Sequence, residues 1–509
     1  MGVRPHRHGR TSFFVLGLGL CLWLGCQAPA RVVQTVLDPH LVDAQTLPSS
    51  PSDTPDDSAG PGSPSTPEQP VASGCPDNLD ERITVSSVLL ARDIRYKLLG
   101  YEGFPFDERV AFAPARDGSA YVAWTDDATG RAVITPLNER FERAGDDIDP
   151  NGYEVGGLVA QDDGFALLTL RDDPALQGTM AAGDPNIGRA VMLVRFRNGA
   201  EVFASPLTGT RSVAQPYRPA AHDSAPGYLY GRLAWNGAKY GAYFIVQQSP
   251  DASRPSMLTD KLVYLDDSGA GLRGGFSSKC TSNQGLRLWP EADVYTPVCI
   301  TDAQPTPGIN LVLEDREPLL LAAEASAPGW SGGQMGSIVK LPADNTYFVG
   351  WLSRDVVPNG QPNQTARLAS DIALVRLGPD FKVIGEKRWL VETPNAAETN
   401  LHFARYGRSH VLMVWDAIVN VRCDRMCYGT YAGTYARVLD REGRVLKEDR
   451  LSAVPNHHDD LVTLPNGDVA WAYVPDDARD YSSVPPSRED RVLAPAKRTF
   501  SVARLRYCE

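Results

Sequence analysis

Residues 401–451 read LHFARYGRSHVLMVWDAIVNVRCDRMCYGTYAGTYARVLDREGRVLKEDRL and contain one complete structural repeat. Four short runs of alternating or β-branched residues are separated by turns and by a loop with two cysteines. The second run carries Trp415, and the third ends in an Asp-x-x-Gly turn at Asp440. Runs of this kind between tight turns are typical of strands. The stretch therefore predicts a four-stranded antiparallel meander.

The same pattern returns on both sides of this stretch. The Trp-bearing run recurs at Trp124, Trp351 and Trp471, with Leu170 aligned to the tryptophan position. The Arg-bearing third run recurs around Arg195, Arg376 and Arg504. A repeated four-strand unit predicts an all-β fold of the β-propeller type, although the spacing is wider than the ~40–45 residues of a WD40 blade. Two β-sandwich domains are the alternative, because they also build short alternating strands.

Seven candidate blades can be placed along the chain. They are residues 109–137, 154–207, 232–276, 286–323, 337–390, 401–451 and 460–507. The fourth has the weakest pattern, so six and eight blades stay open. The seventh lacks a fourth strand, and residues 83–90 read as a strand that belongs to no blade. Pairing of these two would close the ring with an N-terminal strand and remove the exposed sheet edges.

The first 25 residues have the pattern of a targeting signal peptide. Three arginines precede an apolar run at residues 13–24, which is shorter than the ~20 residues of a membrane-spanning helix. The run ends in Leu24-Gly25-Cys26, which resembles the lipobox of bacterial lipoproteins. This resemblance implies acylation of Cys26, with palmitate-type chains, and a place in the cell envelope as an outer-membrane lipoprotein, periplasm-facing or surface-exposed. An ordinary secretory signal is the alternative, and both predict export.

Residues 26–80 are expected to form a tether, and residues 81–509 the propeller domain. The tether is rich in Pro and Ser and has no aromatic residue, so it cannot bury enough apolar surface to fold.

Six cysteines remain besides Cys21 and Cys26, and an even number in an exported chain indicates disulfides. If the N-terminal strand pairs with the last strand, Cys75 and Cys508 lie near one seam. Cys423 and Cys427 share a loop, and Cys280 and Cys299 flank the junction of the third and fourth blades. A zinc site is the weaker alternative, because no second cysteine pair or nearby histidine accompanies Cys-x-x-x-Cys.

The composition also limits the partners. The formal net charge is -12 and there is no long Lys/Arg run, so we expect no nucleic-acid partner. The membrane is expected to be contacted through the lipid anchor only, and a protein or glycan partner through a propeller face.

Three groups of residues have the composition of functional sites. Asp147, Asp149 and Asn151 resemble the start of a calcium loop, although Leu158 stands at the twelfth position instead of Glu. A candidate ligand cluster comprises His402, His457, His458, Asp459 and Asp460, which could bind a metal or form an ordinary polar surface. Ser331 lies in Gly-Trp-Ser-Gly-Gly, but no helix is expected after it, as a hydrolase elbow requires.

These residues favour a binding or scaffolding module over an enzyme. No catalytic residue is assigned and no cofactor is required, with calcium as the one candidate ion. A metal-dependent propeller hydrolase or lyase, with its site at the channel mouth, is the alternative. Fold alone does not separate the two.

Overall fold

The computed structural model of the chain describes most of the region after residue 73. The described residues are 74–95, 97–101, 104–107, 110–174, 188–209, 211–214, 229–248, 257–277, 287–289, 296–301, 308–312, 319–323, 326–327, 330–331, 335–353, 369–391, 393, 396–423, 427–456, 459–475, 491–492 and 497–508.

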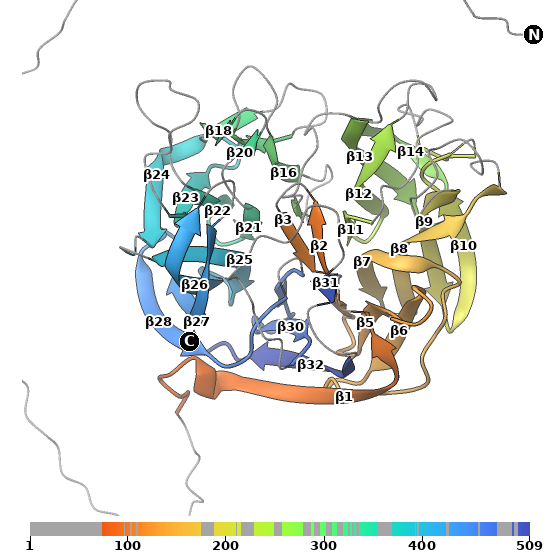
Figure 1. Cartoon of the computed structure of the whole chain (residues 1–509), viewed down its shortest axis with the longest axis horizontal. Coiled ribbons are helices and arrows are strands. Elements are labelled where there is room, and N and C mark those ends of the chain that lie inside the picture. Colours follow the sequence, from red (N-terminus) through yellow and green to blue (C-terminus); the bar gives the residue numbers. More distant parts are fainter. Residues whose placement is uncertain are drawn as a thin grey trace, which may run out of the picture. The chain divides into compact units, whose positions relative to one another are not determined.

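Seven antiparallel sheets are arranged in a ring, each with its first strand near the centre and its last strand on the rim (Figure 1). Blade 1 comprises β4 (Ala111–Pro114), β5 (Ala120–Thr125) and β6 (Ala132–Leu137), and isolated bridges from Ile134 to Ile148 and from Leu137 to Arg143 extend its outer edge. Blade 2 comprises β7 (Tyr153–Gln161), β8 (Gly164–Asp172), β9 (Arg189–Arg197) and β10 (Ala200–Pro206). Blade 3 comprises β11 (Gly231–Trp235), β12 (Lys239–Gln248), β13 (Met257–Asp266) and β14 (Gly271–Ser277).

The remaining four blades complete the ring. Blade 4 comprises β15 (Arg287–Trp289), β16 (Thr296–Thr301), β17 (Gly308–Leu311) and β18 (Leu319–Ala323). Blade 5 comprises β21 (Met335–Leu341), β22 (Thr346–Ser353), β23 (Asp371–Leu377) and β24 (Val383–Val391). Blade 6 comprises β25 (Ala396–Tyr406), β26 (His410–Cys423), β27 (Cys427–Leu439) and β28 (Val445–Leu451). Blade 7 comprises β29 (Val462–Thr463), β30 (Val469–Tyr473), β32 (Lys497–Leu505) and β1 (Ile83–Ile94). The seven-bladed β-propeller is confirmed, and the pair of sandwiches is not formed.

The N-terminal strand closes the ring, as expected from the sequence. Strand β1 pairs antiparallel with β32, from Ile83 opposite Leu505 to Val88 opposite Phe500 (Figure 1). The last blade therefore takes its outermost strand from the start of the domain. The two ends of the propeller domain can separate only if the hydrogen bonds between β1 and β32 break. Strand β1 also covers the edge of β32 that would otherwise be exposed.

Two disulfides join cysteines that the fold brings together. The structure joins Cys75 to Cys508 at the seam, with the two Cα atoms 6.1 Å apart. Cys423 is joined to Cys427 across the end of the β26–β27 hairpin. Cys299 is disulfide-bonded, but Cys280 lies outside the described residues, so its pairing with Cys299 stays a prediction.

The folded unit begins before the expected end of the tether. Leu79 is fully buried among residues of blades 6 and 7, and its backbone N–H donates to Asp449. A short 3₁₀ helix, Asp80–Arg82, follows, and Asp80 accepts hydrogen bonds from Ser452. Leu79 and the disulfide of Cys75 attach this otherwise polar segment to blades 6 and 7. Residues 74–80 therefore belong to the propeller domain. Residues 1–73, with the signal peptide, Cys26 and most of the tether, lie outside the described residues.

The repeated tryptophans pack between blades. Trp124 lies in an apolar cluster with residues of blade 7, Trp351 with blade 4, Trp415 with blade 5 and Trp471 with blade 6. Each therefore fills the space before its own blade, as large aromatics are expected to do. The alignment of Leu170 with them was wrong. Leu170 packs toward blade 3, because a register difference of one residue turns a side chain to the opposite face of a strand.

Three of the third-strand arginines, Arg195, Arg437 and Arg504, are paired with acidic side chains. Arg195 is only 1% exposed, and its guanidinium binds Asp163 and the backbone oxygen of Phe165. Arg504 donates to Asp468 at 2.7 Å, and Arg437 binds Glu448 and lies over the ring of Trp415. These arginines connect strands and turns through paired charges, which the repeat pattern could not indicate.

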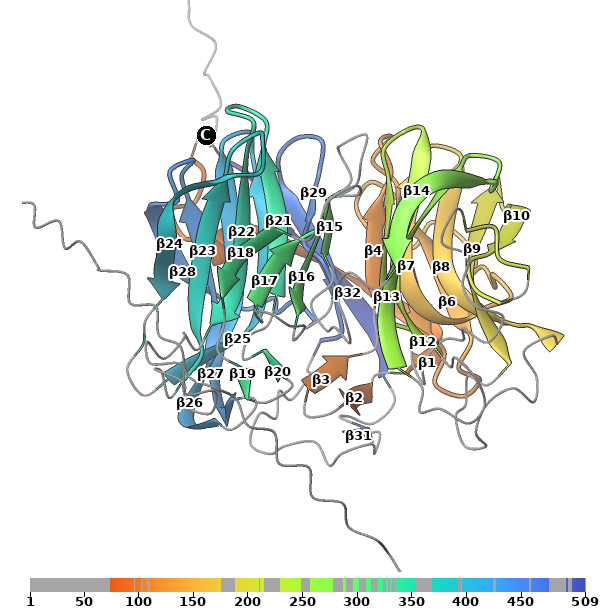
Figure 2. The same ribbon diagram turned by 90° about the horizontal axis from the view of Figure 1, so that it is seen from above.

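Small sheets occupy one face of the ring. Strands β2 (Lys97–Tyr101), β3 (Phe104–Asp107) and β31 (Arg491–Val492) form one of them, and β19 (Ser326–Ala327) with β20 (Trp330–Ser331) forms another. In Figure 2 they lie on the same side as the hairpin end of β26 and β27. We call this side the loop face. Ser331 is in a short hairpin, paired with Ser326, and no described helix follows it, so the hydrolase elbow is not formed.

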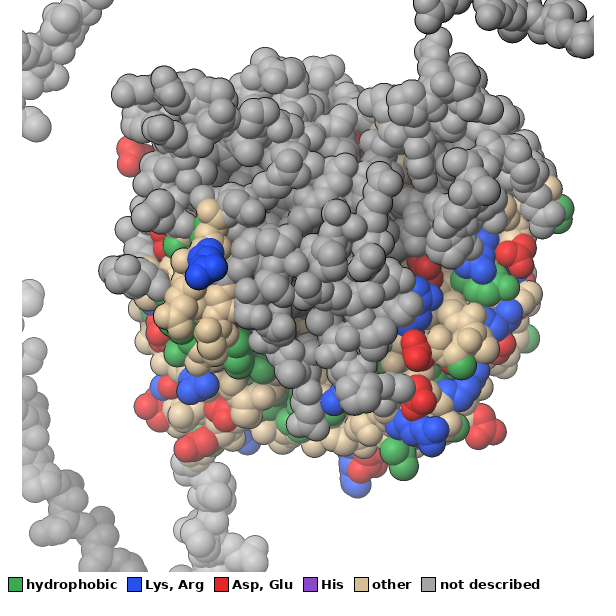
Figure 3. Space-filling model, viewed as in Figure 1, with side chains coloured by type: hydrophobic (Ala, Val, Ile, Leu, Met, Phe, Trp, Pro, Cys, Tyr) green, Lys and Arg blue, Asp and Glu red, His purple; other side chains and the backbone are tan. Residues whose placement is uncertain are grey.

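The opposite face carries the turns between the first and second strands of the blades, and we call it the turn face. The described turns are residues 115–119, 162–163, 236–238, 342–345, 407–409 and 464–468. On the described part of the rim, acidic and basic side chains alternate without a patch of one sign (Figure 3). Within the described chain, no helix has the length and apolar character needed to cross a membrane.

Candidate functional site

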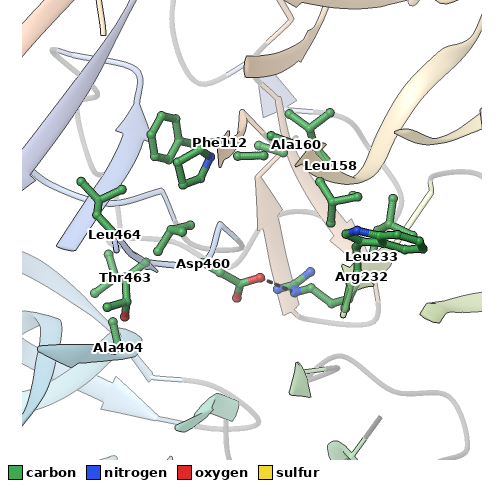
Figure 4. A pocket seen from close by; sticks show the side chains of 18 of the residues that line it. Phe112, Leu158, Ala160, Arg232, Leu233, Ala404, Asp460, Thr463 and Leu464 are labelled. Atoms are coloured by element: carbon green, nitrogen blue, oxygen red, sulfur yellow. Dashed lines mark ion pairs between the residues drawn. The ribbon is translucent and has the colours of Figure 1, made fainter. Parts of the chain in front are cut away.

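A cavity occupies the centre of the ring, with a volume of about 490 Å³. Its described walls come from the first strands of six blades, β4, β7, β11, β21, β25 and β29, and from the loop before β29 (Figure 4). Propeller channels are typical places for ligands, because several blades contribute side chains to one point.

Small residues allow these inner strands to approach one another. A Cβ on Gly157 of β7 would lie 2.7 Å from the backbone nitrogen of Leu233 in β11, so only glycine fits there. Alanines line other parts of the same wall, among them Ala160 and Ala404 (Figure 4). These small residues leave room at the centre, although apolar side chains such as Leu158 and Leu233 also line the cavity.

An ion pair lies at the loop-face end of the cavity. Arg232, near the start of β11, is 4% exposed, and its Nε lies 2.9 Å from a carboxylate oxygen of Asp460 (Figure 4). Its Nη1 also donates to the backbone oxygen of Gly231. Because Asp460 comes from blade 7 and Arg232 from blade 3, the pair links strands on different sides of the cavity and neutralises both charges.

The rest of the described His/Asp cluster holds blades together. Asp459 is buried and accepts hydrogen bonds from the backbone N–H of Val110 and from Asn456, each at 3.0 Å. His402 is buried and shares a 2.8 Å hydrogen bond with Asn400, and Asn400 donates to Asp416. The Asp459 contact connects blades 7 and 1, and Asn400 also donates to the backbone oxygen of Pro455 in the loop between blades 6 and 7, so these side chains have partners within the fold. Within the described residues, no three His, Cys, Asp or Glu side chains form a group that could hold a metal ion.

Two members of the predicted cluster, His457 and His458, lie outside the described residues. The expected equivalence of His402 and His458 in adjacent blades therefore stays a prediction. Asp460 lines the cavity next to blade 7, Asp459 is buried against Val110, and His402 lies in β25 of blade 6.

The predicted calcium loop is built around arginines. Asp149 and Asn151 both accept hydrogen bonds from Arg131, and Asp147 accepts from Arg143 and from Thr135. Burial acts to raise the pKa of Asp149, but the hydrogen bonds from Arg131 and from the backbone of Asn151 outweigh it and the pKa is lowered. The cations that these oxygens contact are guanidinium groups, which explains the acidic turn without calcium.

The turn-face end of the cavity has a different character, which the sequence analysis missed. Arg116, in the turn after β4 of blade 1, and Arg405, near the end of β25 of blade 6, line the cavity together with Trp235. Arg405 is half-buried and Arg116 is exposed. The two turns, residues 115–119 and 407–409, differ in sequence, so no repeated motif marks the arginines. Only the ring brings them to one opening.

No protein-family model matches the chain, and no curated protein matches it. Among solved structures, a protein of unknown function from Dyadobacter fermentans DSM 18053 is 12% identical, covering 83% of this chain and 99% of its own, with a TM-score of 0.36. The Dos1 propeller is 10% identical, covering 82% of each chain, with a TM-score of 0.41. A Trypanosoma rangeli sialidase in complex with the inhibitor DANA is 11% identical, covering 66% of this chain and 58% of its own, with a TM-score of 0.32. At these identities the likeness concerns the fold alone.

Proposed function

We propose that this chain is an exported, lipid-anchored binding module whose ligand site is the central cavity of the propeller. The cavity itself carries the proposal, because six blades contribute to it and its volume of about 490 Å³ suits a small ligand. The sequence predicts a protein or glycan partner on a face of the propeller formed by loops. A protein or glycan partner on that face stays a second prediction.

Binding is favoured over catalysis because the described acids near the cavity already have partners. Asp459 holds Val110 and Asn456, and Asp460 is paired with Arg232. A catalytic acid or base needs to reach a substrate proton. The metal-dependent hydrolase or lyase rests on His457 and His458. Stoichiometric zinc, manganese or iron in the purified chain, lost in a His402→Ala/His458→Ala double variant, would favour that alternative.

Occlusion of the cavity tests the proposed function. Ser337→Trp places a large ring at a cavity-lining, half-buried position of β21, so we expect it to abolish the binding of small molecules that occupy the centre. The measurement is ligand-observed NMR of the full chain with a library of neutral, cationic and anionic compounds. Ala200→Trp, at an exposed position of the rim strand β10, is the matched control and should retain every hit. If no compound binds the wild-type chain in competition with another and is lost in Ser337→Trp, the cavity is not a ligand site.

Anchoring is tested separately at Cys26. Cys26→Ala removes the only sulfur that a lipobox-type signal would acylate, so we expect the chain to lose its lipid label and its membrane association almost completely. Radiolabelled palmitate incorporation and membrane fractionation measure the two effects. Cys21→Ala is the control and should behave as the wild type. Continued fractionation of unprocessed Cys26→Ala with membranes would contradict the lipoprotein assignment.

A further inference from the structure

We propose that the central cavity binds a small organic dianion, and that Arg116 and Arg405 hold its charged groups at the turn-face end. This inference rests on the proposed function, since it names the ligand class of the same cavity. Its basis is the distribution of charge along the cavity wall and the difference between paired and unpaired arginines.

The described lining carries an excess of positive charge. Three arginines contribute to it, Arg116, Arg232 and Arg405, against one carboxylate, Asp460. The whole chain has the opposite sign, with a net charge of -12. A cavity that reverses the sign of its protein concentrates anions, because low-dielectric walls focus the field of the charges inside.

This excess is located at one end of the cavity. Arg232 is neutralised by Asp460 at the loop-face end. Arg116 and Arg405 lie at the turn-face end, and neither has an ion pair with any acidic side chain in the described part of the chain. Asp117, which follows Arg116, instead accepts two hydrogen bonds from Ser119 of its own turn. Two positive charges at the opening match a ligand with two negative charges.

Arg405 is the more buried of the two arginines at this end of the cavity. Its Nε is buried and has no hydrogen-bond partner, although its backbone oxygen accepts a hydrogen bond from Thr463. Since that Nε is shielded, a carboxylate or phosphate group in the cavity would bind the terminal nitrogens of Arg405, which have no acidic partner in the described part of the chain. The Nε of Arg195 is also buried without a partner, but Arg195, Arg437 and Arg504 are each paired with Asp or Glu, whereas Arg405 has no acidic partner among the described residues.

Arg116 extends over the opening. Its Nη2 lies 3.9 Å from the place that a Cβ on Gly237 would occupy, so the side chain reaches from the turn of blade 1 to the turn of blade 3. Gly237 has a φ of +97° and follows Trp235, which lines the same end of the cavity. A planar guanidinium in this position can bind a carboxylate or phosphate group through two hydrogen bonds.

The wall between the two ends is largely apolar and includes Phe112, Leu158 and Leu233 (Figure 4). A ligand with a carbon skeleton fits this wall better than a bare inorganic ion, because the skeleton can displace water from the side chains. The site therefore favours a small organic molecule that carries two carboxylate or phosphate groups.

Calorimetric titration of the purified full chain in detergent tests this inference. The probes are succinate, inorganic phosphate and succinamide, which has the size of succinate without its charges. We expect succinate to bind with a Kd below about 1 mM and succinamide to bind about tenfold or more weakly. Arg405→Gln and Arg116→Gln should each weaken succinate binding about tenfold or more, since each removes a charged hydrogen-bond donor. Arg405→Lys, which keeps the charge but loses the planar fork, should fall between them and the wild type.

Arg388→Gln is the matched control, because Arg388 is an exposed arginine on the rim that donates to the backbone oxygen of Glu442. It should bind succinate as the wild type does, and unchanged circular dichroism of all variants confirms that they fold. Equal affinity for succinate and succinamide, unchanged binding in both glutamine variants, or no anion binding below about 1 mM would overturn the inference. If neutral compounds then bind to the wild type but not to Ser337→Trp, the cavity is still a binding site and the proposed function stands. If no compound does so, both the proposed function and the dianion inference are wrong.

Discussion

Replacement of both Cys75 and Cys508 by serine is expected to lower the free energy of unfolding by about 6 kcal/mol in the loop-entropy model. The disulfide encloses a sequence separation of 433 residues and lies beside the ladder of β1 and β32. A cross-link over so long a loop removes much of the conformational freedom of the unfolded chain. In the variant, the ladder alone must hold the two ends of the domain together. Urea denaturation followed by tryptophan fluorescence measures the loss, because Trp124 and Trp471 are buried in the two clusters that adjoin blade 7.

The Cys423→Ser/Cys427→Ser variant is the matched control. Its disulfide has a sequence separation of only 4, so its removal should cost about 2 kcal/mol or less in the same model. Equal losses in the two variants would show that loop closure does not determine the stability of the ring. A Cys75→Ser/Cys508→Ser chain as stable as the wild type would show that the β1–β32 ladder is sufficient.

The sequence predicted the ring well because its signals are local and repeated. Alternating runs and turn residues specify strands over a few positions, and the unpaired strand at residues 83–90 required a partner that the last blade lacked. The same reasoning failed at Leu170, where a shift of one residue changes which neighbouring blade the side chain contacts. It also placed the end of the tether too late, because a single buried leucine, Leu79, leaves no periodic pattern.

The site was much harder to predict than the fold. The candidate His/Asp cluster was chosen by residue type, yet its buried members Asp459 and His402 have partners within the fold. The sequence does not indicate a binding role for Arg116 or Arg405, because isolated arginines in or near turns are common. Their importance comes from the closure of the ring, which brings residues almost 300 positions apart in the chain to one opening. Local sequence patterns cannot predict that two such distant residues line the same opening.

Glu398 should make the stability of the domain depend on pH in the neutral range. Its side chain is 1% exposed in β25, and its backbone exchanges hydrogen bonds with Ser370 of the neighbouring blade. Burial, followed by the nearby carboxylate of Asp371, raises the pKa of Glu398 to about 8. The ordinary value is 4.5, so the folded state binds a proton that the unfolded state releases between these two values. The contribution of this proton is complete below pH 4.5 and is lost as the pH rises to 8.

We therefore expect the wild-type chain to lose roughly 4 kcal/mol of unfolding free energy between pH 5 and pH 9 from this group. Glu398→Gln should remove that part of the pH dependence and should be more stable than the wild type at pH 9, because the amide stays neutral. Urea denaturation across this pH range gives the two curves. Glu386→Gln, at an exposed position of β24, is the control and should retain the wild-type slope. Parallel curves for the wild type and Glu398→Gln would mean that Glu398 is ionised in the folded chain. The interface of blades 5 and 6 would then have to hold the negative charges of Glu398 and Asp371 together.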